Sequence, residues 1–89
     1  MAEKRLSSTG EALKAVLLEM VEEPDRVLVR EKRRGDKVRL EVNVASGDMG
    51  AVIGRGGRTA SALRELLDTR SGSFGEKYEL KILEPEDRP

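Results

Sequence analysis

Three glycines crowd into four positions near the middle of the chain, in the tetrapeptide Gly54-Arg55-Gly56-Gly57. Glycine is the poorest helix former after proline, so no helix runs through this stretch and a tight turn is expected there. The apolar pair Val52-Ile53 precedes the turn, and a helical pattern over residues 58–70 follows it. The sequence therefore predicts two helices joined by a glycine-rich turn.

The first half of the chain has the pattern of a helix followed by a hairpin. Apolar residues recur at helical spacing over residues 10–22, and Pro24 is expected to end this helix. Residues 37–45 alternate apolar and polar side chains, which is typical of a strand with one buried face. Gly35-Asp36 supplies the turn that joins this strand to another over residues 26–33, so the two strands are antiparallel.

Short polar side chains indicate where two of the helices begin. Ser8 or Thr9 is the expected N-cap of the first helix, because a hydroxyl oxygen accepts a hydrogen bond from a free backbone N–H group there. Ser46 or Asp48 is expected to do the same for a short helix over residues 49–53.

The order of the elements predicts a two-layer architecture. A last strand is expected over residues 77–83. If it lies beside the strand over residues 37–45, the helices between them form a right-handed crossover and the two strands run parallel. The order α-β-β-α-α-β then gives an α/β (α+β) two-layer sandwich, with a three-stranded mixed sheet and three helices on one face. A single domain is expected over residues 8–84, between a flexible leader at 1–7 and a flexible acidic tail at 85–89.

Composition narrows the classes of function. The chain of 89 residues has no cysteine and no histidine, so it has no disulfide, no Cys/His zinc site, no thiol nucleophile and no imidazole acid or base. No apolar run approaches the roughly 20 residues that span a bilayer, and the first residues lack the apolar segment of a signal peptide. We therefore expect a cytoplasmic protein without metal, cofactor, small-molecule substrate or membrane partner.

Charge is abundant but balanced, with 17 basic and 17 acidic residues. A chain without net charge is not a general polycation, so any contact with nucleic acid depends on local placement of charge. Residues 11–23 are mainly acidic, whereas residues 52–64 carry Arg55, Arg58 and Arg64 without an acid. The region of the glycine turn is therefore locally basic.

The glycine turn is a candidate phosphate-binding site. A turn that opens a helix presents free backbone N–H groups beside the positive end of the helix dipole, and glycine lets a phosphate come close. A P-loop needs Lys-Ser/Thr after its last glycine, and a dinucleotide fingerprint needs a third glycine where Thr59 stands. Neither pattern fits, whereas the G-x-x-G loop of the KH module, which clamps about four single-stranded nucleotides, does.

The segment V-A-S-G-D-M-G-A-V-I-G-R-G-G-R-T-A-S-A-L-R resembles the core of a type II KH domain and is most similar to the KhpA family of small bacterial single-domain KH proteins. The likeness extends from the first helix to Leu83. It implies a cytoplasmic RNA-binding protein without enzymatic activity, an RNA chaperone or post-transcriptional regulator linked to cell shape. It also implies pairing with a second copy or with a second KH protein, KhpB (Jag). Family members usually have a polar or basic residue where this chain has Gly56, so its loop has one side chain fewer for phosphate.

The resemblance assigns roles to individual residues. Residues 54–57 clamp the RNA backbone, and Arg55 and Arg58 neutralise phosphates. Val52, Ile53 and Leu63 are candidates for an apolar floor against which the bases lie. Ordinary packing in the core is an equal alternative for these three residues. Arg64 is a further candidate, with an ion pair to Asp68 at i+4 as its alternative. The full set of candidate RNA-binding residues is Gly54, Arg55, Gly56, Gly57, Arg58, Val52, Ile53, Leu63 and Arg64.

Two other functions remain open. One is a protein-interaction subunit with a KH-like fold, which docks a partner such as a second KH protein and binds RNA weakly. The other is a small enzyme that uses Asp48 or Glu65 beside a loop-bound phosphate. The enzyme is disfavoured, because isolated carboxylates at helix starts are usually caps or solvated charges. The only aromatic residues, Phe74 and Tyr78, lie outside the loop, so base stacking is scarce and RNA affinity is expected to be modest.

Overall fold

The computed structural model describes residues 6–72 and 75–84, which form one α+β domain. Phe74 and most of the expected leader and tail lie outside these residues. The elements are α1 (Ser8–Met20), η1 (Pro24–Arg26), β1 (Leu28–Arg34), β2 (Lys37–Asn43), η2 (Ser46–Asp48), α2 (Met49–Ile53), η3 (Arg55–Gly57), α3 (Arg58–Arg70) and β3 (Lys77–Ile82).

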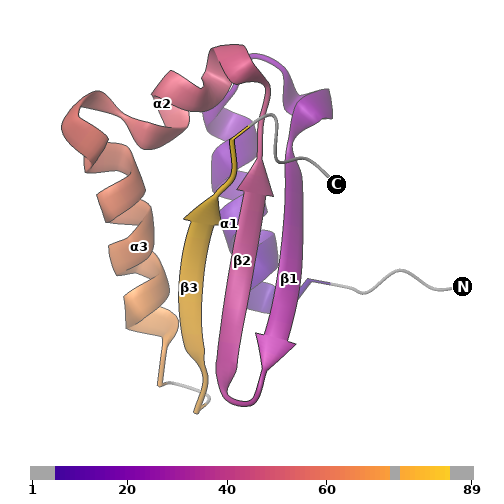
Figure 1. The fold of residues 1–89 in the computed structure, drawn as a ribbon, viewed down its shortest axis with the longest axis vertical. Helices are drawn as coiled ribbons and strands as arrows, with labels where there is room; N and C mark the ends of the chain where they lie inside the picture. The colour runs from indigo at the N-terminus through magenta and orange to yellow at the C-terminus, as the bar shows by residue number, and fades with distance from the viewer. Residues whose placement is uncertain (1–5, 73–74, 85–89) are drawn as a thin grey trace, which may run out of the picture.

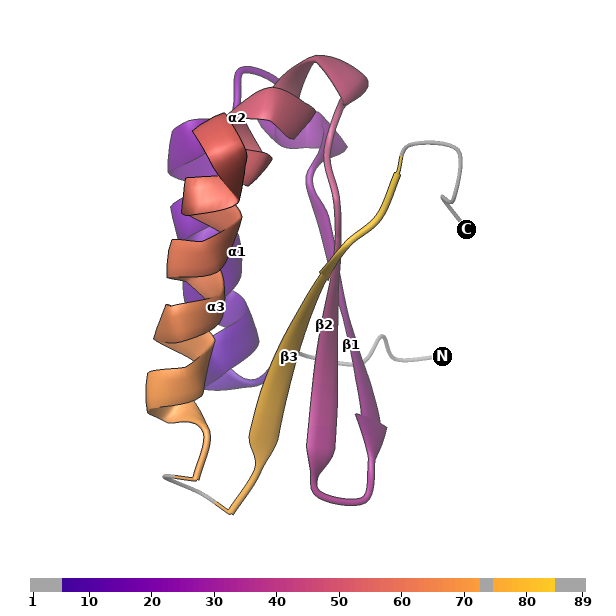
Figure 2. The same ribbon diagram turned by 60° about the vertical axis from the view of Figure 1, so that its left-hand side comes forward.

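The three strands form one mixed sheet in the order β1-β2-β3. β1 and β2 form an antiparallel hairpin, with Val29 opposite Val42, and β2 and β3 run parallel, with Leu40 opposite Leu80. The three helices cover one face of the sheet, and no described helix covers the other face (Figures 1 and 2). The predicted two-layer sandwich and the predicted parallel pairing are confirmed.

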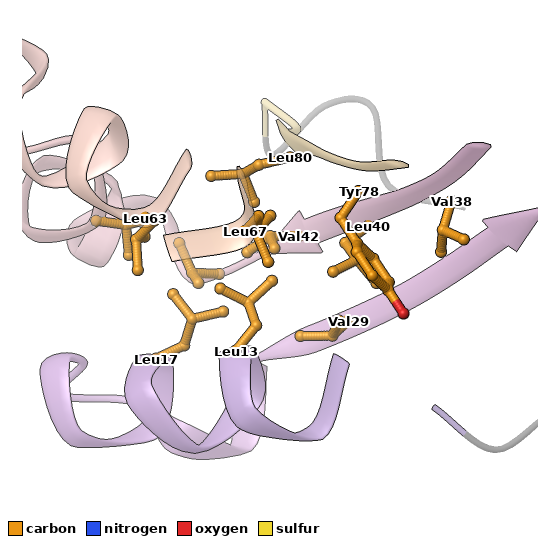
Figure 3. Close-up of a cluster of buried hydrophobic side chains, with 12 residues drawn as sticks. Leu13, Leu17, Val29, Val38, Leu40, Val42, Leu63, Leu67, Tyr78 and Leu80 are labelled. Carbon is orange, nitrogen blue, oxygen red and sulfur yellow. The ribbon is translucent and has the colours of Figure 1, made fainter. Parts of the chain in front are cut away.

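The hydrophobic core lies between the sheet and the helical layer. Figure 3 shows leucines of α1 and α3 meeting the inward side chains of all three strands. Because side chains alternate along a strand, the polar residues between these core positions project from the open face of the sheet. The largest almost fully buried apolar residues are Leu13, Leu17, Val38, Leu40, Val42, Val44, Val52 and Leu67.

The N-cap of α1 is Ser7, so the prediction of Ser8 or Thr9 is wrong. The Ser7 hydroxyl accepts a hydrogen bond from the Gly10 N–H group at 3.1 Å. Both the Ser7 N–H and the Ser7 hydroxyl donate to Glu31 Oε1, each at 2.9 Å. Ser7 is therefore held at the cap position by a carboxylate of β1, which is far from it in the sequence. A pattern of neighbouring residues does not reveal such a contact.

Ser8 and Thr9 have a different role, in which they join two helices. The Arg70 Nε group donates to Thr9 Oγ1 at 2.9 Å, and another nitrogen of the same guanidinium donates to Ser8 Oγ at 3.1 Å. Arg70 is the last residue of α3, so these hydrogen bonds hold the end of α3 against the start of α1.

Candidate nucleic-acid interface

The glycine turn joins α2 to α3 within the helical layer (Figure 1). The Gly57 N–H donates to the Gly54 carbonyl oxygen at 3.0 Å and closes the turn. Gly54, Gly56 and Gly57 have φ angles of 80°, 64° and 79°. Residues with a side chain rarely adopt such angles, so the backbone path of this turn requires glycine at several positions. The turn expected from the glycine density is present.

The three glycines differ in the space around them. A β-carbon at Gly54 would lie 2.7 Å from the Thr59 backbone nitrogen and would also overlap the Thr59 side chain. A β-carbon at Gly56 or Gly57 would meet no atom within 4 Å. Gly54 is therefore needed for packing within the turn, whereas the backbone of Gly56 and Gly57 borders open space that a ligand can enter.

The start of α3 combines the positive end of the helix dipole with two arginine side chains. Gly57 is the N-cap, no side chain caps the helix, and its first turn contains no acid. The first N–H groups of an α-helix lack partners within the helix, and the helix dipole adds partial positive charge there. Arg55 and Arg58 are both exposed at this end. The Gly57 N–H already donates to the Gly54 carbonyl and the Arg58 N–H to the Arg55 carbonyl, so an anion placed above Gly56 and Gly57 would meet the positive end of the helix dipole and two guanidinium groups.

The three predicted floor residues lie at different depths. Val52 is 0% exposed and Leu63 is 5% exposed, so both are core residues, as the alternative of ordinary packing requires. Ile53 is 37% exposed at the end of α2, next to the turn. Only Ile53 of the three presents a substantial apolar surface to a ligand, while Val52 and Leu63 anchor α2 and α3 from below.

Arg64 lies away from the turn, on the side of α3 that faces β3. It forms no ion pair with Asp68 in this structure, so that alternative is not observed. Both side chains line a shallow hollow of about 230 Å³ between α3 and β3, together with Lys77 and Glu79. The structure thus groups Arg55 and Arg58 at the turn and places Arg64 at a separate hollow.

Asp48 has a structural role that the sequence pattern does not predict. It is 5% exposed, and its carboxylate accepts hydrogen bonds from the backbone N–H groups of Glu22 at 3.0 Å and Glu23 at 3.1 Å. Asp48 does occupy the N-cap position of α2, as predicted, but it makes no side-chain hydrogen bond to the start of that helix. Both carboxylate oxygens therefore hold the segment that follows α1, which gives this buried carboxylate a structural role.

Residues 6–72 and 75–84 were compared with what a metal site and a membrane-spanning helix require. No group of three or more acidic side chains in this part of the chain lies close enough to hold a metal ion. No helix in the same residues has both the length and the apolar character needed to cross a membrane.

Comparison with known proteins agrees with this geometry. Residues 10–82 match the family model described as KhpA/KhpB, KH domain. The chain is 34% identical over 74 residues to RNA-binding protein KhpA of Chlamydia trachomatis, which covers 83% of this chain and 95% of the relative. The protein of the same name from Aquifex aeolicus is 33% identical over 79 residues, or 89% of this chain and 100% of the relative. The Mycobacterium leprae protein of that name is 49% identical over 59 residues, or 64% of this chain and 71% of the relative. With its α-β-β-α-α-β order and its glycine turn between α2 and α3, the chain belongs to the KhpA/KhpB family of KH domains.

Proposed function

We propose that this protein binds single-stranded RNA at the glycine turn, with the RNA backbone against residues 54–57 and the first turn of α3. The observation that carries the proposal is the open space beside Gly56 and Gly57, next to a helix start that has neither a side-chain cap nor an acid. The names of the relatives, which are RNA-binding proteins, support the choice of RNA as the ligand.

Each residue near the turn has a role in this proposal. The positive end of the α3 dipole attracts phosphate oxygens beside Gly56 and Gly57, and Arg55 and Arg58 neutralise their charge. Ile53 provides apolar surface for a base, with Val52 and Leu63 holding the two helices in place beneath it. Arg64 contacts RNA that continues from the turn toward the hollow between α3 and β3. If three arginines each neutralise one phosphate, the slope of log K against log salt concentration is about −2, at about 0.7 per contact.

The finer role that we propose is that of an RNA chaperone or post-transcriptional regulator in the bacterial cytoplasm, without enzymatic activity. This role rests on membership of the family. A dimer, with a second copy or with a KhpB (Jag)-like KH protein, fits the modest affinity expected of one turn without aromatic side chains. Two linked grooves bind more tightly than one because the second binding event is intramolecular.

The test is fluorescence anisotropy of a labelled pool of short single-stranded RNAs. The variant Arg55→Asp with Gly56→Asp places two negative charges at the turn, and both positions are exposed. The matched control, Arg26→Asp with Gly72→Asp, makes the same charge change at another exposed arginine and another exposed glycine of positive φ. We expect binding that weakens with salt and that falls only in the turn variant. Equal binding by the two variants would remove the proposal.

A second candidate function is protein docking, which is favoured by apolar side chains that remain exposed on the helical layer. Val16 and Leu18 of α1 are each 38% exposed, and Leu66 of α3 is 41% exposed. In this function the KH fold binds a protein partner and contacts RNA weakly. A partner that stays bound to the tagged protein after nuclease treatment, and is lost with Leu66→Asp, would favour docking over RNA binding.

A further inference from the structure

The open face of the sheet carries an excess of positive charge. Strand alternation and register place three basic residues of β1, two of β2 and two of β3 on this face, against two acidic residues. The whole chain has as many acids as bases, so the excess reflects placement and not general basicity. We call these seven residues the basic sheet face: Arg30, Lys32, Arg34, Lys37, Arg39, Lys77 and Lys81.

Several cations of the basic sheet face stand directly opposite one another. In the antiparallel pair, Lys32 is opposite Arg39 and Arg34 is opposite Lys37. In the parallel pair, Lys37 is opposite Lys77. Like charges on directly opposite residues destabilise a sheet. The fold itself therefore does not account for this arrangement, whereas binding of an anion does.

Acidic neighbours neutralise only part of the basic sheet face. Lys32 Nζ lies 3.4 Å from Glu41 Oε1, and an Arg39 guanidinium nitrogen lies 3.9 Å from Glu41 Oε2, so one carboxylate serves two cations. The side chains of Lys32 and Arg39 nevertheless remain 55% and 52% exposed. Across residues 6–72 and 75–84, Arg34, Lys37 and Lys77 are in no ion pair.

Four of these seven cations line a hollow at the hairpin end of the sheet. The hollow measures about 530 Å³. Its lining consists of five basic residues, Lys32, Arg33, Arg34, Lys37 and Arg39, and one acidic residue, Glu79. No aromatic side chain lines it. A surface of this kind can hold phosphates, but it cannot stack bases as single-strand binding proteins do.

We propose that the basic sheet face is a second RNA-binding surface, which holds the phosphate backbone of the RNA whose single strand occupies the glycine turn. A polyanion fits this surface because its repeated charges can engage several cations at once and release counterions. The inference rests on the proposed function for the identity of the ligand. Figure 2 shows the helical layer, to which the turn belongs, on one side of the sheet, and strand register places the basic sheet face on the other side. Only an RNA long enough to pass around the edge of the sheet reaches both surfaces.

The test uses a double variant that removes two facing cations, Arg34→Gln with Lys37→Gln, neither of which lines the hollow between α3 and β3. Both side chains are exposed and form no ion pair with another described residue, so no contact seen in the fold is lost with them. The matched control, Lys14→Gln with Arg26→Gln, removes the same charge from α1 and η1, and neither residue is ion-paired within the described part of the chain. Thermal unfolding should show a midpoint for the sheet variant that equals or exceeds that of the wild type, because a like-charge pair has been removed.

Binding is measured for two single-stranded RNAs, one of about five nucleotides, near the length that a KH groove holds, and one of about 25 nucleotides. With the longer RNA, we expect the salt slope of the sheet variant to be smaller than that of the control by about 1.4, or about 0.7 for each lost phosphate contact. Between 50 and 200 mM salt, this difference corresponds to a factor of about 7 in affinity. The short RNA should bind the wild type, the control and the sheet variant equally.

The two proposals fail in different ways. A sheet variant that binds the longer RNA with the affinity and salt slope of the control would overturn the second surface. An equal loss on the short and the longer RNA would also overturn it, because the short RNA cannot reach both faces. If the short RNA fails to bind even the wild type, while the longer RNA still depends on Arg34 and Lys37, the glycine turn fails as an RNA site and the basic sheet face stands.

Discussion

Gly54 lies so close to Thr59 that a β-carbon on Gly54 would be 2.7 Å from the Thr59 backbone nitrogen. Gly54 also has φ 80° and ψ 167°, a conformation that is essentially restricted to glycine. Gly56, by contrast, has φ 64° and ψ 17° and open space around it. The same substitution should therefore have different costs at two positions only two residues apart.

We predict that Gly54→Ala lowers the free energy of unfolding by about 2–4 kcal/mol, from the backbone strain and the overlap with Thr59 together. Gly56→Ala should cost about 1–2 kcal/mol, because only its left-handed backbone opposes a side chain. Urea denaturation of the two variants measures both values. Equal costs at the two positions would contradict the contact between Gly54 and Thr59.

Asp48 should contribute to stability and not to catalysis. Asp48→Ala leaves the N–H groups of Glu22 and Glu23 without their acceptor in a partly buried site, which should lower the free energy of unfolding by about 1–3 kcal/mol. Asp48→Asn keeps one acceptor oxygen and should cost less. The exposed Glu65 is the control, since Glu65→Ala should change stability by less than about 0.5 kcal/mol. An Asp48→Ala variant as stable as the wild type would disprove this role.

The Arg33 guanidinium lowers the pKa of the Glu76 carboxyl below its ordinary value of about 4.3, mainly through a hydrogen bond, and the Tyr78 hydroxyl adds a second one. Because the pKa is lower in the folded protein, this interaction stabilises the fold above the unfolded pKa, and the stabilisation is lost as the pH falls through the folded pKa. We predict that Arg33→Gln raises the Glu76 pKa more than Tyr78→Phe does. Titration of the carboxyl carbon by NMR measures both shifts, and a larger effect of Tyr78→Phe would reverse the assigned order.

Ile53 is expected to contact RNA through its apolar side chain. Ile53→Ala should weaken binding of a short single-stranded RNA by about 1 kcal/mol, or about fivefold, since it removes apolar area beside the turn. Leu66→Ala is a matched control, because Leu66 is 41% exposed and Ile53 is 37% exposed. Anisotropy titrations compare the two. An equal change in both variants would indicate that Ile53 does not lie at the RNA site.

Part of this protein could be predicted from the sequence because the signals are local. Alternation over β2, the Gly35-Asp36 turn and the glycines at 54–57 restrict the backbone within a few residues, so the order of the elements and the position of the turn were predictable. The parallel pairing of β2 and β3 followed from that order, because a crossover through two helices brings the strands side by side in the same direction. Arg55 and Arg58 were predictable as the charges of the candidate site because they adjoin the turn.

The remaining features depend on residues that are distant in sequence, and only the tertiary structure determines them. Ser7 caps α1 because Glu31 of β1 accepts its hydrogen bonds, and Asp48 faces Glu22 and Glu23 and not its own helix. Lys37 and Lys77 likewise lie opposite each other only because β2 and β3 pair in the folded chain. The sequence alone determined which segments become helices, strands and turns, because backbone preference is a short-range property. Burial, hydrogen-bond partners and the gathering of charge on one face were decided by packing between those segments, because they require atoms that only the folded chain brings together.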